Sequence, residues 1–226
     1  GLPIATYFSV SKILWLLRNI EDVQKAKSNN DLCFGTIDSW LLYKLTGEHV
    51  TDVTNASRTL LMDLKSLEWI DDILETLSIP KASLPSIKPS MFNYGTNDKI
   101  LKNIPITAVL GDQQASLFGQ NCINPGDVKN TYGTGCFALT NTGKNIVHSN
   151  NGLLSTIAFQ REGSSPQYAL EGSVSIAGAA VQWLRDNLNL INESKDVEAL
   201  ALSVKDNGDV YFVPAFSGLF SPHWDE

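Results

Sequence analysis

The chain has 226 residues, of which 43% are hydrophobic and 18% are charged, and this ordinary globular composition excludes an intrinsically disordered protein. Its 17 basic and 24 acidic side chains give a formal net charge of -7, which argues against nucleic acid or an anionic membrane as a partner. The three cysteines are far apart and include no Cys-x-x-Cys pair, so the sequence predicts neither a disulfide framework nor a thiolate zinc site and suits a reducing compartment.

No targeting or membrane segment is visible in the sequence. No apolar run approaches the ~18 to 20 residues of a membrane span, and no signal peptide opens the chain. We therefore expect a soluble, cytoplasmic protein without membrane insertion. Because the sequence begins at Gly1 without methionine and stops at Glu226 after an apolar stretch rich in proline and glycine, we also expect a section of a longer protein.

Apolar residues recur at three- and four-residue steps in three places, which predicts three helices that serve as packing elements: 11–20, 40–45 and 69–77. Asp38 can cap the second helix and Gly47 can end it, while Pro80 stops the third. The segment 78–103 holds three prolines and scattered charges, and we predict an irregular surface connection with little chemistry there.

The second half of the chain has a different pattern. The apolar run 106–110 predicts a short buried strand that leads into a helix beginning near Asp112. Short stretches of β-branched and aromatic residues, broken by glycine turns, predict a three-stranded antiparallel meander over 127–170. A helix is expected over 176–184 and a further strand over 210–213, so the fold class is α/β.

Asp112 is the first candidate for chemistry, because it follows the expected strand and opens the next helix. Open α/β sheets bind ligands outside the ends of their strands, and a helix N-terminus attracts anions. A carboxylate at this position can act as a base. The same residue can instead serve only as the cap of the following helix, and the sequence leaves both interpretations open.

Gly133 and Gly135 flank Thr134 in a turn between two predicted strands. Such a turn lets backbone N–H groups approach phosphate oxygens and adds a hydroxyl donor, although an ordinary tight hairpin has the same composition. Gly178 and Gln182 lie one turn apart on the next predicted helix, where a glycine leaves room for a flat ring or allows close packing. Neither a dinucleotide-binding fingerprint nor a Walker loop is present. The three histidines lack a second ligand at zinc spacing, so no metal site is predicted.

Six motifs, taken together and in order, resemble signatures of the FGGY carbohydrate kinases, a family of the actin-like ATPase superfamily. They span the length of the chain and lie at residues 7–16, 51–59, 111–114, 130–137, 168–172 and 213–216. The second motif, Thr-Asp-Val-Thr-Asn-Ala-Ser-Arg-Thr, is similar to glycerol kinases in particular. The chain is therefore identified as a central section of such a kinase.

This resemblance implies a fold, an activity and a set of partners. The fold is α/β of the actin-like ATPase (ribonuclease H-like) type, with parts of two lobes around a cleft. Residues 1–120 would belong to the first, glycerol-side lobe and residues 121–226 to the second, nucleotide-side lobe. The activity is transfer of a phosphoryl group from ATP, with Mg²⁺, to the terminal hydroxyl of glycerol. A homo-oligomer without a nucleic-acid partner is also expected.

The resemblance also implies roles for single residues. Asp112 corresponds to the general base, and the residues that correspond to glycerol contacts are Tyr7, Gln113 and Phe137, together with Asp112 itself. The residues that correspond to nucleotide contacts are Gly133 and Thr134 in a phosphate loop, and Gly178 and Gln182 on a helix.

Several parts of the family's site have no counterpart in this sequence. They are the N-terminal phosphate loop with its Mg²⁺-associated aspartate, an Arg-Glu pair that grips glycerol, and the C-terminal adenosine loop. We therefore expect that these 226 residues alone do not turn over. A kinase of another polyol or a pentulose from the same family, or a non-catalytic binding protein on this fold, is the alternative.

Overall fold

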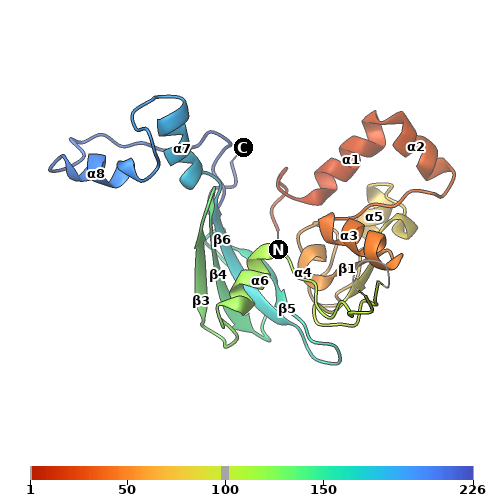
Figure 1. Ribbon diagram of the computed structural model, residues 1–226. Coiled ribbons are helices and arrows are strands. Elements are labelled where there is room, and N and C mark those ends of the chain that lie inside the picture. Colours follow the sequence, from red (N-terminus) through yellow and green to blue (C-terminus); the bar gives the residue numbers. More distant parts are fainter. Residues whose placement is uncertain (1, 98–101, 226) are drawn as a thin grey trace.

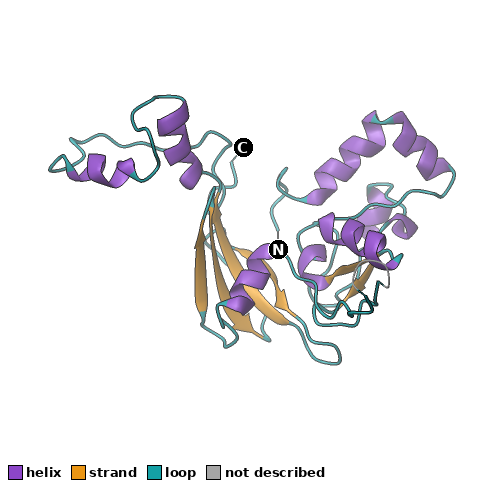
Figure 2. Ribbon diagram, viewed as in Figure 1, coloured by secondary structure: helices purple, strands orange, loops and turns teal. Residues whose placement is uncertain are grey.

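The computed structural model describes residues 2–97 and 102–225, in which helices dominate the first half and a four-stranded sheet dominates the second (Figures 1 and 2). The helices are α1 (Ser9–Asn19), α2 (Glu21–Ser28), α3 (Ile37–Thr46), α4 (Val53–Ala56), α5 (Asp71–Thr76), the 3-10 helix η1 (Lys81–Ser83), α6 (Asp112–Gly119), α7 (Gly178–Asp186) and α8 (Asp196–Leu202). The strands are β1 (Val50–Asp52), β2 (Ser86–Lys88), β3 (Val128–Tyr132), β4 (Cys136–Gly143), β5 (Leu154–Phe159) and β6 (Gln167–Val174). Within these described residues, no helix has the length and apolar character needed to cross a membrane.

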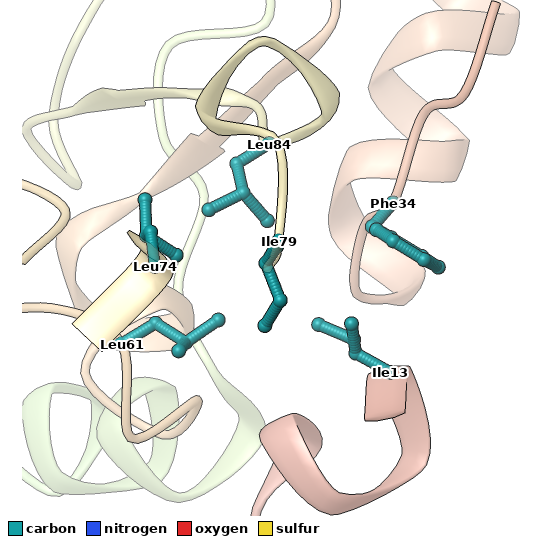
Figure 3. Packing of buried hydrophobic residues seen from close by; sticks show 6 residues of the cluster. All are labelled: Ile13, Phe34, Leu61, Leu74, Ile79 and Leu84. Atoms are coloured by element: carbon teal, nitrogen blue, oxygen red, sulfur yellow. The ribbon is translucent and has the colours of Figure 1, made fainter. Parts of the chain in front are cut away.

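The predicted helices 11–20, 40–45 and 69–77 are confirmed as α1, α3 and α5, although α5 is shorter than its apolar pattern. The apolar faces of α1 and α5 meet in one core cluster, whereas Leu42 of α3 belongs to another. The side chains of the first cluster point toward one another in Figure 3: Ile13, Phe34, Leu61, Leu74, Ile79 and Leu84. Burying a side chain of this size stabilises the fold by about 1.5 to 3 kcal/mol. This cluster holds α1 and α5 against the segments that flank them.

The expected cap of α3 by Asp38 is wrong, because Thr36 occupies the cap position and Asp38 lies in the first turn. The Asp38 carboxylate instead accepts hydrogen bonds from the hydroxyls of Thr36, at 2.5 Å, and Thr51, at 2.7 Å. Asp38 therefore ties the start of α3 to strand β1. Gly47 ends α3 in the left-handed conformation at φ 81°, as predicted.

The segment 78–103 is more ordered than its prolines suggest, insofar as it lies inside the described residues; positions 98–101 lie outside them. It contains η1 and strand β2, which pairs in parallel with β1 in the register Val50 to Ser86. Tyr94 of this segment is 4% exposed and packs with Leu42 and Val50. The prediction of an irregular surface connection is therefore wrong for its first part.

The antiparallel sheet of the second half has the strand order β3-β4-β6-β5, so the predicted three-stranded meander is wrong. The last strand, β6, inserts between β4 and β5 and pairs with both. Within the expected strand over 106–110 only Ala108 forms an isolated bridge, and the expected strand over 210–213 is exposed and unpaired. The helix expected over 176–184 is confirmed as α7.

The two halves meet through buried contacts. Helix α4 packs against β5, and α6 lies on β3, β4 and β5. Between the halves, Ser57 and Thr156 share a hydrogen bond of 2.9 Å between their hydroxyls, and the Tyr168 hydroxyl donates to the Leu64 carbonyl at 2.8 Å. Both halves therefore contribute to the surroundings of α6, whose first residue is Asp112.

Candidate active site

Asp112 is the first residue of α6, and Gly111 before it is the N-cap. The interpretation of Asp112 as a mere cap is therefore not realised. Its Oδ1 accepts a hydrogen bond of 2.8 Å from the Gln113 amide, its Oδ2 lies 3.4 Å from Gln113 Nε2, and the residue is exposed. Asp112 is thus an accessible carboxylate held by its neighbour.

A buried chain of hydrogen bonds fixes the point where α6 begins. The Gly111 amide donates to the Thr54 hydroxyl at 2.8 Å, and that hydroxyl donates to the Asp52 carboxylate at 2.8 Å. Asp52 also accepts from the Thr54 and Asn55 amides and from the Ser90 hydroxyl. Burial raises the pKa of Asp52, and these donors oppose the rise. The residue before Asp112 is therefore anchored to the end of β1.

Gln113 contacts a buried lysine of the sheet. Lys129 of β3 is 5% exposed, and its Nζ donates to Gln113 Oε1 at 2.5 Å, to the Thr131 hydroxyl at 2.9 Å and to the Phe137 carbonyl at 3.2 Å. Burial lowers the pKa of Lys129, while the carboxylates of Glu171 and Asp112 raise it. The sheet thus places a cation beneath the first turn of α6.

Tyr7 lies in an aromatic and charged cluster formed by distant parts of the chain. Its ring makes edge contacts with Phe8 and Phe220, at centroid distances of 5.2 Å, and the Arg58 guanidinium lies 5.5 Å from its centroid. Arg58 Nη2 pairs with the buried Glu171 of β6 at 2.8 Å and lies 3.5 Å from the Tyr7 hydroxyl. The ion pair therefore holds one face of Tyr7.

Lys129 and Glu171 place charges near two predicted polyol contacts, Asp112 and Tyr7. Lys129 interacts electrostatically with both Asp112 and Glu171, and Glu171 pairs with Arg58 beside Tyr7. Sequence reasoning did not single out these three charged residues. Arg58 and Glu171 lie inside the recognised motifs, but a single sequence does not show that a charged side chain is buried and paired.

A cavity of about 360 Å³ lies beside Tyr7, between α1 and the segments around β1. Apart from Tyr7, Lys12 and a few hydroxyl residues, its lining is mostly apolar and includes the core side chains Ile13 and Phe34. Asp112 does not line it. This cavity is therefore separate from the carboxylate, and we assign it no part in the chemistry.

Phe137 of β4 is half-buried and packs against the cluster that contains Leu117 of α6, Leu139 and Ala158. Its partner across the sheet is Ser173 of β6 on one side and Thr131 of β3 on the other. The ring thus supports α6 from the sheet. The backbone carbonyl of Phe137 also accepts a hydrogen bond from Lys129.

The Gly133-Thr134-Gly135 turn joins β3 to β4 and meets the start of α7. The amides of Ala177 and Gly178 donate to the carbonyls of Thr134 and Gly133, at 2.8 and 2.9 Å. A Cβ on Gly178 would lie 2.6 Å from the Gly133 carbonyl oxygen, and one on Gly135 would lie 2.4 Å from the Val174 oxygen. Glycine at these positions is therefore required by close backbone packing.

This packing determines which hydrogen-bonding groups of the turn remain free to bind a ligand. The first amides of α7 are bonded to the turn, whereas the amide and hydroxyl of the exposed Thr134 make no hydrogen bond within the described residues. Gln182 is exposed one helical turn after Gly178. The space at Gly178 is filled by the turn itself, so close packing, rather than room for a ring, explains this glycine.

A metal centre is not formed by the described part of the chain. No group of three histidine, cysteine, aspartate or glutamate side chains there could hold a metal ion. The three cysteines are free, and Cys33 is exposed, while Cys122 is buried.

Comparison with known proteins decides the family. Residues 1–119 match the model of the N-terminal domain of the FGGY family of carbohydrate kinases, and residues 128–226 match the model of its C-terminal domain. The chain belongs to the FGGY family of carbohydrate kinases. Its α/β fold is accordingly the actin-like ATPase fold of that family, as expected from the six motifs.

Relatives within the FGGY family include curated glycerol kinases. The chain is 56% identical to glycerol kinase from Brucella anthropi and 53% identical to that from Leifsonia xyli, over 100% and 99% of this chain and 46% of each relative. The crystal structure of Plasmodium falciparum glycerol kinase with ADP matches with a TM-score of 0.85 and 40% identity, over 100% of this chain and 46% of that one. The chain thus spans about half the length of the relatives it matches.

A xylulose kinase structure from Lactobacillus acidophilus also matches, with a TM-score of 0.75 and 24% identity, over 96% of this chain and 44% of that one. This likeness shows the FGGY fold alone. The fold is therefore shared by kinases of different sugars and polyols, and it does not select the acceptor.

Proposed function

We propose that the complete product of the gene encoding this chain phosphorylates glycerol to glycerol 3-phosphate with ATP as the donor. The observation that carries the proposal is the identity of more than 50% to glycerol kinases over essentially the whole chain. The chain would supply the base and part of the pockets for glycerol and for the nucleotide. Its length, 46% of the relatives, leaves the rest of the site to other parts of that product.

Asp112 is proposed as the general base. An alcohol is a poor nucleophile, so its hydroxyl proton must pass to an acceptor as its oxygen forms a bond to the γ-phosphorus and ADP leaves with the electrons of the broken P–O bond. The exposed carboxylate of Asp112 can accept that proton, and its bond to the Gln113 amide keeps it oriented. Most of the acceleration would come from positioning and electrostatics.

The glycerol pocket is proposed to include Tyr7, Gln113 and Phe137 beside Asp112. Gln113 offers an amide group next to the carboxylate, and Tyr7 is held by the pair of Arg58 and Glu171. Phe137 would form an apolar wall for the carbon chain.

The nucleotide side is proposed to include Gly133, Thr134, Gly178 and Gln182. The glycines allow the turn and α7 to pack closely, which leaves the amide and hydroxyl of Thr134 to meet phosphate oxygens. Gln182 lies exposed on the same helix as Gly178. These residues fit a phosphate group. Mg²⁺ would arrive with ATP, and since the described residues form no acidic cluster for it, we assign it no step.

We also propose a division into two lobes, a location and an oligomeric state for the complete protein. Residues 1–120 are assigned to the first, glycerol-side lobe and residues 121–226 to the second, nucleotide-side lobe. The complete protein is expected to be cytoplasmic and a homo-oligomer.

The alternative is a kinase of a pentulose or another polyol, since the fold is shared with a xylulose kinase. The test compares phosphorylation of glycerol and xylulose by the purified complete gene product, with ADP release as the measurement. We expect kcat/KM for glycerol to exceed that for xylulose by more than a hundredfold, because a pocket built for specific hydroxyls rejects analogues strongly. If kcat/KM for xylulose equalled or exceeded that for glycerol, the proposal of glycerol as the substrate would be wrong. If neither compound were phosphorylated, a binding protein would be favoured.

A further inference from the structure

Lys129 is a lysine without a role in the function proposed above, yet it is 5% exposed inside the sheet. Burying an ammonium group is costly unless polar groups replace the lost water. Three oxygens do so here, from Gln113, Thr131 and the Phe137 backbone, and the carboxylates of Asp112 and Glu171 lie near enough to favour its charge. A fully partnered cation under the first turn of α6 calls for an explanation.

The hydrogen-bonding chemistry of the Lys129 ammonium group and the Gln113 carboxamide determines the orientation of that amide. An ammonium group only donates hydrogen bonds, while a carboxamide has one accepting oxygen and one donating nitrogen. The side that contacts Lys129 must therefore be Oε1, at 2.5 Å. Nε2 then lies on the opposite side, 3.4 Å from Asp112 Oδ2.

We propose that Lys129 is a positioning residue that locks the Gln113 amide with its nitrogen toward Asp112, so that Gln113 donates to the polyol oxygen whose proton Asp112 accepts. The inference rests on the proposed function and deepens it. If the amide were reversed, its oxygen would face the carboxylate and repel it, and the polyol would meet two acceptors. Lys129 prevents that reversal without touching the substrate.

A purely structural role for Lys129 is the competing explanation, because its contacts also join α6 to the β3–β4 hairpin. The two explanations differ in one respect. A structural tie affects stability and activity whatever residue occupies position 113, whereas a positioning residue acts on the substrate only through Gln113.

The test is a double-variant cycle in the complete gene product with Lys129→Met, Gln113→Ala and the pair, measuring kcat, KM for glycerol and melting temperature. Losing a hydrogen bond to a charged or oriented group corresponds to about a tenfold effect. We expect KM to rise about tenfold in each single variant and no further in the pair, with kcat changed less than threefold. Lys144→Met, at an exposed lysine, is the control and leaves KM unchanged.

A KM that rises about a hundredfold in the pair, as the product of the two single effects, would overturn the inference, as would an unchanged KM in Lys129→Met. Absence of glycerol turnover by the unaltered protein would overturn the proposed function together with the inference, so the two failures are distinguishable.

Gln113→Glu covers the case in which Lys129→Met does not fold, because this variant keeps an oxygen toward Lys129 and gains an ion pair with it. The proposal predicts that its melting temperature holds while KM for glycerol rises at least tenfold, since the atom facing the polyol changes from nitrogen to oxygen. In a reversed amide that atom is already an oxygen, and an unchanged KM in Gln113→Glu would overturn the inference.

Discussion

The carboxylate of Asp112 combines exposure with fixed orientation, which is what a proton acceptor for a bound hydroxyl needs. Asp112→Asn keeps the shape and one oxygen for the Gln113 amide but removes the basic oxygen. In the complete gene product we expect kcat for glycerol phosphorylation to fall by about 10² to 10⁴, with KM changed only modestly. Steady-state kinetics of both proteins measures the change.

The matched control for Asp112→Asn is Asp209→Asn, at an exposed aspartate with φ 57°, a conformation that asparagine adopts readily. It should leave kcat unaltered. Wild-type turnover in Asp112→Asn would remove this residue from the role of base and leave it as a helix-terminal charge.

The Phe137 ring packs against the apolar cluster beneath α6 and is also proposed to border the polyol. Phe137→Ala should lower the free energy of unfolding by about 2 to 4 kcal/mol, because a half-buried ring leaves a cavity. It should also raise KM for glycerol more than it lowers kcat. Urea unfolding and steady-state kinetics separate the effects, and a destabilised variant with an unchanged KM would confine the ring to the cluster.

Single residues also show what a sequence can reveal about a site. Asp112 could be picked out from its place before a helix, and the turn around Thr134 from its glycines. Lys129 and Glu171 could not, because a charged residue in an alternating strand pattern is expected on the solvent face. Here both are buried, since each finds partners on other elements: Gln113 on α6 for Lys129, and Arg58 after α4 for Glu171.

At the scale of elements, the start of α6 depends on a bond from another part of the chain. Thr54 is fully buried and its hydroxyl both accepts from the Gly111 amide and donates to Asp52. Thr54→Val keeps the volume but leaves the half-buried Gly111 amide and the buried Asp52 carboxylate short of a partner, which costs about 1 to 3 kcal/mol. We expect this loss of unfolding free energy together with a lower kcat, because Asp112 follows Gly111 directly.

Thr54→Ser is the matched control, since it restores the hydroxyl and removes only a methyl group. It should recover most of kcat and more than half of the stability lost in Thr54→Val. Denaturant unfolding and glycerol kinetics of the two variants give the comparison. If both variants kept the kcat of the unaltered protein, the bond to Gly111 would have no part in placing Asp112.

The elements that sequence patterns predicted well are those whose pattern is local. α1 and α7 have apolar stripes that need no knowledge of their partners, and Gly47 ends α3 by its own backbone preference. The order of the sheet is not local: whether β6 lies beside β4 or at an edge depends on pairing between residues about 30 apart, such as Leu139 and Glu171. The run 106–110 is as apolar as a strand, but it pairs through a single bridge, between Ala108 and Met91.

At the scale of the whole molecule, the chain exposes more surface than its mass requires. Its accessible surface is 13530 Å², whereas a compact monomer of 24.7 kDa exposes about 10,100 Å². The excess includes large apolar side chains on two regions, α3 and the segment after α8. Exposed examples are Ile37, Trp40, Val204, Tyr211 and Val213. Apolar surface of this extent is normally covered by other protein.

The surface excess and the coverage of 46% of the relatives lead to the same prediction for the 226 residues by themselves. They carry the proposed base and one proposed phosphate turn, and from the resemblance we expect no counterpart among them of the family's N-terminal phosphate loop or adenosine loop. With glycerol and ATP, the isolated chain should release no ADP above the rate of the buffer, whereas the complete gene product should turn over. It should also bind a hydrophobic dye more strongly per residue than the complete product, because α3 and the segment after α8 stay uncovered. Turnover by the isolated chain at a rate within tenfold of the complete product would mean that these 226 residues already form the whole site.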